Sequence, residues 1–111
     1  MTAPKITIEK DPSTWRISAN GTKLGVSRDV LCMTEGTYPP VLYVPQADLG
    51  MALFAATDKS THCPHKGDAS YFTVSGLENV GWCYETPFDN VSAIKDHIAF
   101  YVDRVSVEKQ P

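Results

Sequence analysis

The sequence has 111 residues, of which 42% are hydrophobic and 21% charged, and its formal net charge is −3. This composition is that of a folded globular domain and excludes a disordered, collagen-like or fibrous chain. The small negative charge also argues against electrostatic attraction to nucleic acid or to an anionic membrane. We therefore expect one domain over residues 1–111, with a core from about residue 5 to residue 108 and short loose ends.

The cysteines Cys32, Cys63 and Cys83 are odd in number, and the N-terminal segment has no apolar stretch of the kind found in secretion signals. Both features favour free thiols and a cytoplasmic location. The longest uncharged segment, residues 36–47, contains prolines and is shorter than the roughly 20 residues that a membrane-spanning helix needs. The sequence thus predicts a protein that does not cross a membrane.

Alternation of apolar and polar residues predicts strands in the first part of the chain. Residues 5–9 and 15–19 alternate with period two, and Leu24 and Val26 follow the pair Asn20-Gly21. Both residues of an Asn-Gly turn tolerate positive φ, which a tight hairpin requires. We therefore expect a β-hairpin centred on Asn20-Gly21.

The middle of the chain contains two continuous apolar runs, residues 30–33 and 41–44. Such runs are typical of strands buried on both faces, or of a strand beside a short helix. A rigid loop over residues 36–40, with two prolines, joins them. Beyond the second run, residues 46–49 can form one helical turn, and we expect residues 51–56 to form a strand.

Residues 71–74 and 80–84 predict a second hairpin across Ser75-Gly76. Successive side chains of a strand point to opposite faces. The second strand should therefore place Val80, Trp82 and Tyr84 on one face. Gly81 and Cys83 should lie on the opposite face. Alternating aromatic residues of this kind are more often packed in a core than arranged as a stacking surface.

The C-terminal residues predict a short helix and a kink. Asp89-Asn90 can cap a helix over residues 91–97, so that His97 ends it. The apolar residues 98, 100 and 102 have one parity, whereas 105 and 107 have the other. If both sets are buried, a bulge or kink is expected near Asp103-Arg104.

Together these elements predict a mainly β fold, a β-rich α+β domain with one or two short helices. Many short strands without long parallel crossovers favour antiparallel pairing. Such strands bury their apolar faces by forming a curled sheet, an open barrel or two packed sheets, and the pattern leaves these three alternatives open.

The side chains best suited to chemistry are concentrated between residues 57 and 76. Six of them lie within ten positions: His62, Cys63, His65, Lys66, Asp68 and Tyr71. One hypothesis is metal binding, because Cys63 and His65 are good zinc ligands and can share one face of an extended segment. The paired spacings of structural zinc sites are absent, so further ligands would have to come from Cys83, His97 or a carboxylate. The sequence therefore requires no cofactor and leaves a divalent metal open.

A second hypothesis is catalysis by a nucleophilic cysteine. Cys63 would need a neighbouring base or cation to lower its pKa from about 8.5. His65 suits this role better than His62, because adjacent residues of an extended chain point to opposite faces. The catalytic candidates on this hypothesis and the next are Cys63, Lys66 and Asp68.

A third hypothesis is an anion site, in which Lys66 supplies positive charge and Gly67 lets backbone N–H groups approach a phosphate or carboxylate. Neither a P-loop nor a dinucleotide-binding glycine pattern is present. Aromatic residues from the predicted second hairpin would line such a pocket. The predicted ligand-binding residues are His62, His65, Lys66, Gly67, Tyr71, Trp82 and Tyr84.

Two interpretations without catalysis compete with these hypotheses. In the first, Pro64 and Gly67 shape a tight structural loop whose histidines lie at the surface. In the second, the protein is an interaction module that meets a protein partner through exposed sheet edges or the Tyr38-Pro39-Pro40 loop. The sequence also leaves a homodimer open.

Several segments resemble a known family. The string THCPHKGDASYF (residues 61–72) is preceded by GTYPPVLYVPQADL (36–49) and followed by NVGWCYETP (79–87) and AFYVDRVSV (99–107). In order, from about residue 15 to 108, the chain resembles the domain of unknown function 427 family. The family's motif falls on Cys63, Lys66, Gly67, Ala69, Tyr71, Trp82, Tyr84, Pro87, Tyr101 and Val105. His65 and Phe72 stand where many relatives carry Tyr and Trp.

The resemblance implies a small, mostly β protein, and because the family is also catalogued as nucleotidyltransferase-like, it implies transfer of a nucleotidyl group. Transferases of the well-known type hold two magnesium ions with an Asp-x-Asp pair beside Gly-Ser, and this sequence contains neither. The sequence thus favours a protein that binds a small anionic or phosphate-bearing molecule at a loop from Cys63 to Tyr71.

Overall fold

Antiparallel strands make up most of residues 5–111, the part of the chain that the computed structural model describes. The strands in this range are β1 (Ile6–Lys10), β2 (Trp15–Ala19), β3 (Thr22–Ser27), β4 (Leu31–Glu35), β5 (Val41–Pro45), β6 (Phe54–Cys63), β7 (Gly67–Val74), β8 (Leu77–Tyr84), β9 (His97–Phe100) and β10 (Ser106–Lys109). Three short 3-10 helices in the same range complete the fold: η1 (Gln46–Asp48), η2 (Met51–Leu53) and η3 (Asp89–Ile94).

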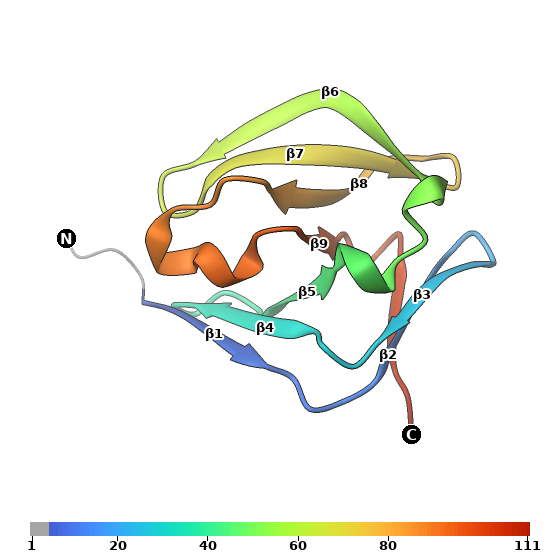
Figure 1. Cartoon of the computed structure of the whole chain (residues 1–111), viewed down its shortest axis with the longest axis horizontal. Helices are drawn as coiled ribbons and strands as arrows, with labels where there is room; N and C mark the ends of the chain where they lie inside the picture. The colour runs from blue at the N-terminus through green and yellow to red at the C-terminus, as the bar shows by residue number, and fades with distance from the viewer. Residues whose placement is uncertain (1–4) are drawn as a thin grey trace.

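The strands form two sheets within the described residues. The larger has the order β1-β4-β5-β9-β8-β7-β6, and the smaller has the order β10-β2-β3. Figure 1 shows the larger sheet strongly curved, with β6 and β7 on one side of the molecule and β4 and β1 on the other. Because β1 and β6 remain its edges, the sheet does not close into a barrel. The predicted mainly β class is therefore confirmed, in its form with two packed sheets.

Two apolar clusters cover the two faces of the larger sheet. On β9, Ile98 belongs to the first cluster and Ala99 to the second, as expected when side chains alternate. The small sheet contributes Ile17 and Leu24 to the first cluster, whereas η3 contributes Ile94 to the second. The small sheet thus packs on one face and η3 on the other.

Local signals in the sequence predict the turns correctly. Asn20 and Gly21 have φ values of 49° and 78° and join β2 to β3. Ser75 and Gly76 have φ values of 49° and 80° and join β7 to β8. The kink predicted near Asp103-Arg104 is a turn between β9, in the larger sheet, and β10, in the smaller one.

The prediction of a strand over residues 51–56 is wrong for its first half. Residues 51–53 form η2, and β6 then runs from Phe54 to Cys63. Most side chains of β6 are exposed, and the strand lies at the edge of the larger sheet. A polar edge strand has no alternating apolar face, so hydrophobic periodicity does not reveal it.

The predicted face of Val80 is also wrong. Val80 packs in the first cluster together with Cys83, whereas Trp82 and Tyr84 belong to the second. Asn79 has a φ of 52°, and the β7–β8 register shifts between Phe72 and Val74. An irregularity of this kind re-aims the neighbouring side chain and breaks the strict alternation on which the prediction depended.

The predicted helix over residues 91–97 is instead η3, which ends at Ile94, and His97 begins β9 rather than ending a helix. Val91 has φ −126°, so even this short segment is kinked. Two turns are too few to form a stable α-helix on their own, and packing of Val91 and Ile94 decides the local shape. No helix of residues 5–111 is long and apolar enough to span a membrane.

Candidate ligand-binding site

A cavity lies where β5 and β9 separate. These neighbouring strands are joined at only two register positions, Val44↔Ile98 and Pro45↔His97. Beyond them, the start of β5 and the residues that follow β9 line a cavity of about 750 Å³ between them. Its lining residues are Glu35, Tyr38, Pro39, Pro40, Val41, Leu42, Val44, Trp82, Phe100, Tyr101, Val102, Asp103 and Val107.

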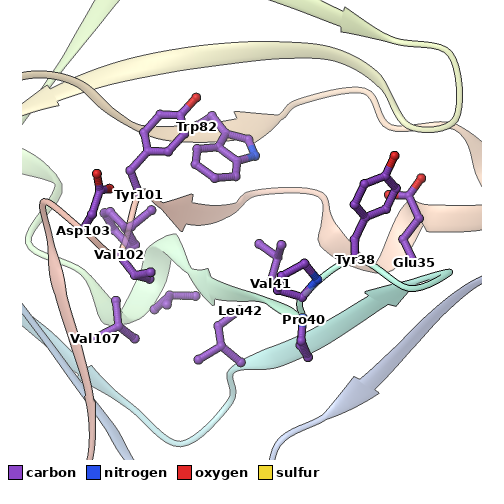
Figure 2. A pocket seen from close by; sticks show the side chains of 13 residues that line it. Glu35, Tyr38, Pro40, Val41, Leu42, Trp82, Tyr101, Val102, Asp103 and Val107 are labelled. Atoms are coloured by element: carbon purple, nitrogen blue, oxygen red, sulfur yellow. The ribbon is translucent and has the colours of Figure 1, made fainter.

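Figure 2 shows that Asp103 and Glu35 lie toward opposite ends of this cavity, with Leu42 and Val41 between them. Trp82 and Tyr101 form an aromatic corner, with ring centroids 4.7 Å apart and ring planes inclined by 48°. Because nearly all remaining lining side chains are aliphatic, proline or aromatic, the cavity is mainly apolar with polar groups near its ends.

A narrower pocket of about 130 Å³ shares Glu35, Tyr38 and Trp82 with the larger cavity and reaches Lys66. Lys66 Nζ lies 2.6 Å from Glu35 Oε1, and the two side chains are only 11% and 16% exposed. This pair joins the turn after β6 to the end of β4, which lie 31 positions apart in the sequence. Lys66 is therefore held by a largely buried carboxylate.

Buried phenols close the narrower pocket. Tyr43 is 2% exposed, and burial raises its pKa to about 12, with Cys63 and Glu35 acting in the same direction. Burial also raises the pKa of Tyr84. Both phenols therefore stay protonated at neutral pH and can donate hydrogen bonds to a ligand atom placed there.

Replacing Tyr43 with Phe is expected to flatten the alkaline part of the stability profile. The folded-state pKa is raised above its ordinary value of 10.0. The stability that the protonated Tyr43 contributes is therefore complete below about pH 10. It is lost as the pH rises toward about 12, where Tyr43 also ionises in the folded state. Denaturant unfolding measured from about pH 8 to about pH 12 should show a smaller decrease in the free energy of unfolding for Tyr43→Phe than for wild type. Parallel curves for the two proteins would contradict this.

The predicted loop from Cys63 to Tyr71 is in fact the tip of the β6–β7 hairpin. Only residues 64–66 form the turn, and Tyr71 lies within β7, where it is 7% exposed. Lys66 N–H donates to the Cys63 carbonyl, and Phe88 N–H donates to the Lys66 carbonyl. These bonds fix the backbone of Lys66, and its side chain is only 11% exposed.

The profile of one protein family, described as Domain of unknown function (DUF427), matches residues 7–111. The chain belongs to the DUF427 family. The short name of the profile refers to nucleotidyl transfer, whereas its description assigns no function. A comparison of this DUF427 protein with curated proteins gives no match.

In the DUF427 protein, some of the predicted site residues meet and others do not. Lys66, Trp82 and Tyr84 share the narrower pocket. Cys63 and Tyr71 line neither cavity but neighbour residues that do: Cys63 Sγ lies 3.8 Å from Lys66 Nζ, and the ring centroids of Tyr71 and Trp82 are 6.5 Å apart.

The remaining predicted residues lie outside both cavities. His62 Nδ1 is 2.7 Å from Asp68 Oδ1, in an exposed pair on the outer side of the hairpin. His65 is half-buried and lines neither cavity. Gly67 has a φ of 118° and packs against Thr86, so its role is to shape the backbone.

The metal hypothesis gains nothing from the geometry. Cys63 packs against the second cluster and Cys83 lies within the first, so the two thiols are on opposite faces of the sheet. Within residues 5–111, no three His, Cys, Asp or Glu side chains are grouped so that they could hold a metal ion.

Sequence reasoning missed the other half of the site. Glu35 and Asp103 line the larger cavity and Tyr43 the narrower pocket, but none of the three is a motif position of the resembled family. Strand pairing brings Glu35 and Tyr43 there, and Asp103 lies in the turn between β9 and β10. Two features of the sequence indicate this half of the site: the rigid Tyr38-Pro39-Pro40 loop, and Tyr101, which belongs to the resembled motif. Both line the larger cavity.

Proposed function

We propose that this DUF427 protein binds a small organic molecule with a mainly apolar body in the cavity between β5 and β9. The observation that carries the proposal is the cavity itself, with its volume of about 750 Å³ and its mainly apolar walls. Ligand pockets in proteins typically occupy about 300–1,000 Å³ and combine apolar walls with a few polar groups. Burial of about 200 Å² of apolar ligand surface would contribute about 5 kcal/mol before the costs of association.

The aromatic side chains support a ligand with a rigid body. Trp82 is half-buried and its ring centroid lies 4.7 Å from that of Tyr101, so the two rings form one aromatic wall of the cavity. The polar groups at the ends, including Glu35, would orient the ligand. An anionic or phosphate group at Lys66, as the sequence favoured, would have to displace the Glu35 carboxylate from its 2.6 Å contact.

The alternative of a protein-interaction module has one feature in its favour. Tyr38 and Val102 are 68% and 74% exposed at the rim of the cavity. The apolar surface between them is hollow rather than flat, however, and a concave apolar site suits a small molecule better than a protein surface. We therefore place ligand binding first.

Filling the cavity should abolish ligand binding. Val41 lines it and is half-buried, so Val41→Trp would place a large ring inside. A thermal-shift screen with neutral, cationic and anionic organic compounds should find ligands that stabilise wild type but not Val41→Trp. At a ligand concentration of one hundred times its Kd, the stabilisation is about 2.7 kcal/mol.

The matched control for this variant is Val26→Trp, because Val26 is 41% exposed on β3 and does not line the cavity. It should keep the response of wild type to each ligand. Ligands that stabilise all three proteins equally would contradict the proposal, as would a screen in which no compound stabilises wild type.

A further inference from the structure

The charges around the larger cavity point to the kind of ligand it takes, an inference that rests on the proposed function. Of the described residues that line the cavity, only Glu35 and Asp103 are charged, and both are acids. The protein as a whole carries a formal charge of −3. We propose that the ligand is an organic cation, an amine or quaternary ammonium group attached to an apolar body.

Asp103 is the carboxylate available to such a cation. Glu35 is already paired with Lys66, whereas none of the ion pairs among residues 5–111 involves Asp103. Asp103 is exposed, so its attraction acts mainly as a screened field at the cavity mouth. The cation therefore belongs at the Asp103 end, and the apolar body extends toward Leu42 and Val44.

The aromatic corner lies at this same end. Figure 2 shows Tyr101 next to Asp103, with Trp82 beside Tyr101 toward the middle of the cavity. The ring centroids are 4.7 Å apart, so a cation in the corner would lie within about 6 Å of both rings, the range in which cation–π attraction operates. Trp and Tyr faces lined by a carboxylate are the chemistry that recognises quaternary ammonium groups.

The carboxylates that attract a cation would repel an anion in the same cavity. The anion would share the cavity with two carboxylates, whereas Lys66, in the adjoining narrower pocket, is only 11% exposed and 2.6 Å from Glu35. Like-charge placement of this kind is unfavourable and discriminates against the wrong ligand. The geometry thus separates cationic from anionic molecules of the same shape.

The test compares three probes of similar shape: benzyltrimethylammonium, its neutral carbon analogue neopentylbenzene, and the anion phenylmethanesulfonate. Binding of each to the full chain is measured by NMR titration. The cation should bind about tenfold more tightly than the neutral analogue, and the anion most weakly. Equal affinity for cation and neutral analogue would overturn this inference and leave the proposed function standing. Tighter binding of the anion would overturn it too, and no binding of any probe would overturn both.

Two pairs of variants locate the cation. Tyr101→Leu should remove most of the preference for benzyltrimethylammonium over neopentylbenzene, whereas Tyr101→Phe, which keeps the ring face, should retain it. Asp103→Asn should weaken cation binding by about twofold to fivefold and reduce its dependence on salt, as expected for an exposed charge. The control Asp58→Asn, on the exposed edge strand β6, should change neither. A preference that survives Tyr101→Leu would overturn the placement of the cation in the aromatic corner.

Discussion

Replacing Lys66 with Met is expected to lower the free energy of unfolding by about 3 kcal/mol, because it leaves a carboxylate in a largely buried position without its partner. Glu35 is only 16% exposed, and its Oε1 accepts a hydrogen bond from Lys66 Nζ at 2.6 Å. The measurement is equilibrium unfolding in urea. The double variant Lys66→Met/Glu35→Gln should recover part of the loss, since it removes the unpaired charge.

The chain contains a matched control for this prediction. Lys10 and Asp29 form an ion pair at 3.0 Å, but their side chains are 63% and 64% exposed. Lys10→Met should therefore change stability by less than about 1 kcal/mol, as is usual for solvent-exposed pairs. If Lys66→Met were as mild as Lys10→Met, the buried Lys66–Glu35 pair would contribute no more to stability than a solvent-exposed pair.

Replacing Gly25 with Ala is expected to lower the free energy of unfolding by up to about 3 kcal/mol, the upper range for overpacking. Gly25 lies on β3 and bridges to Leu49, next to η1. A Cβ at Gly25 would overlap the backbone carbonyl oxygen of Asp48, which cannot move aside as a flexible side chain can. Thermal and urea unfolding would both report the loss.

Gly50→Ala provides the comparison for this backbone contact. Its φ is −76°, and a Cβ there would meet its nearest atoms, in Leu24 and Leu53, at 3.5 and 3.6 Å, which is ordinary van der Waals contact. This variant should stay within about 0.5 kcal/mol of wild type, as for substitutions without a specific clash. Similar losses for Gly25→Ala and Gly50→Ala would contradict the close approach of β3 to η1.

Features of the fold that depend on neighbouring residues were predictable from the sequence. Asn20-Gly21 specifies its hairpin because both residues adopt positive φ locally. The change of parity from residues 98, 100 and 102 to residues 105 and 107 likewise indicated the turn that transfers the chain from one sheet to the other, although Val102 is 74% exposed in that turn. By contrast, β6 was hidden because its exposed polar side chains show no alternation.

The site was only half predictable, because its partners meet through the sheet order. Lys66 could be singled out by its chemistry, but its partner Glu35 lies 31 positions away and is brought near by the curved arrangement of β4, β5, β9, β8 and β7. The cavity itself results from the short β5–β9 ladder, which no residue pattern encodes. Lys66 was predictable from its residue type, whereas its pairing with the largely buried Glu35 was not.

The most direct test of ligand binding between β5 and β9 uses the two tryptophans of the chain as reporters. Trp82 lines the cavity, whereas Trp15 is not among its lining residues and its indole N–H donates to Asp11. In an NMR titration of the wild-type protein with benzyltrimethylammonium and, separately, neopentylbenzene, the Trp82 indole signal should shift with saturation while the Trp15 signal stays in place. Two stationary signals with both probes, or equal shifts of both signals, would contradict binding in this cavity.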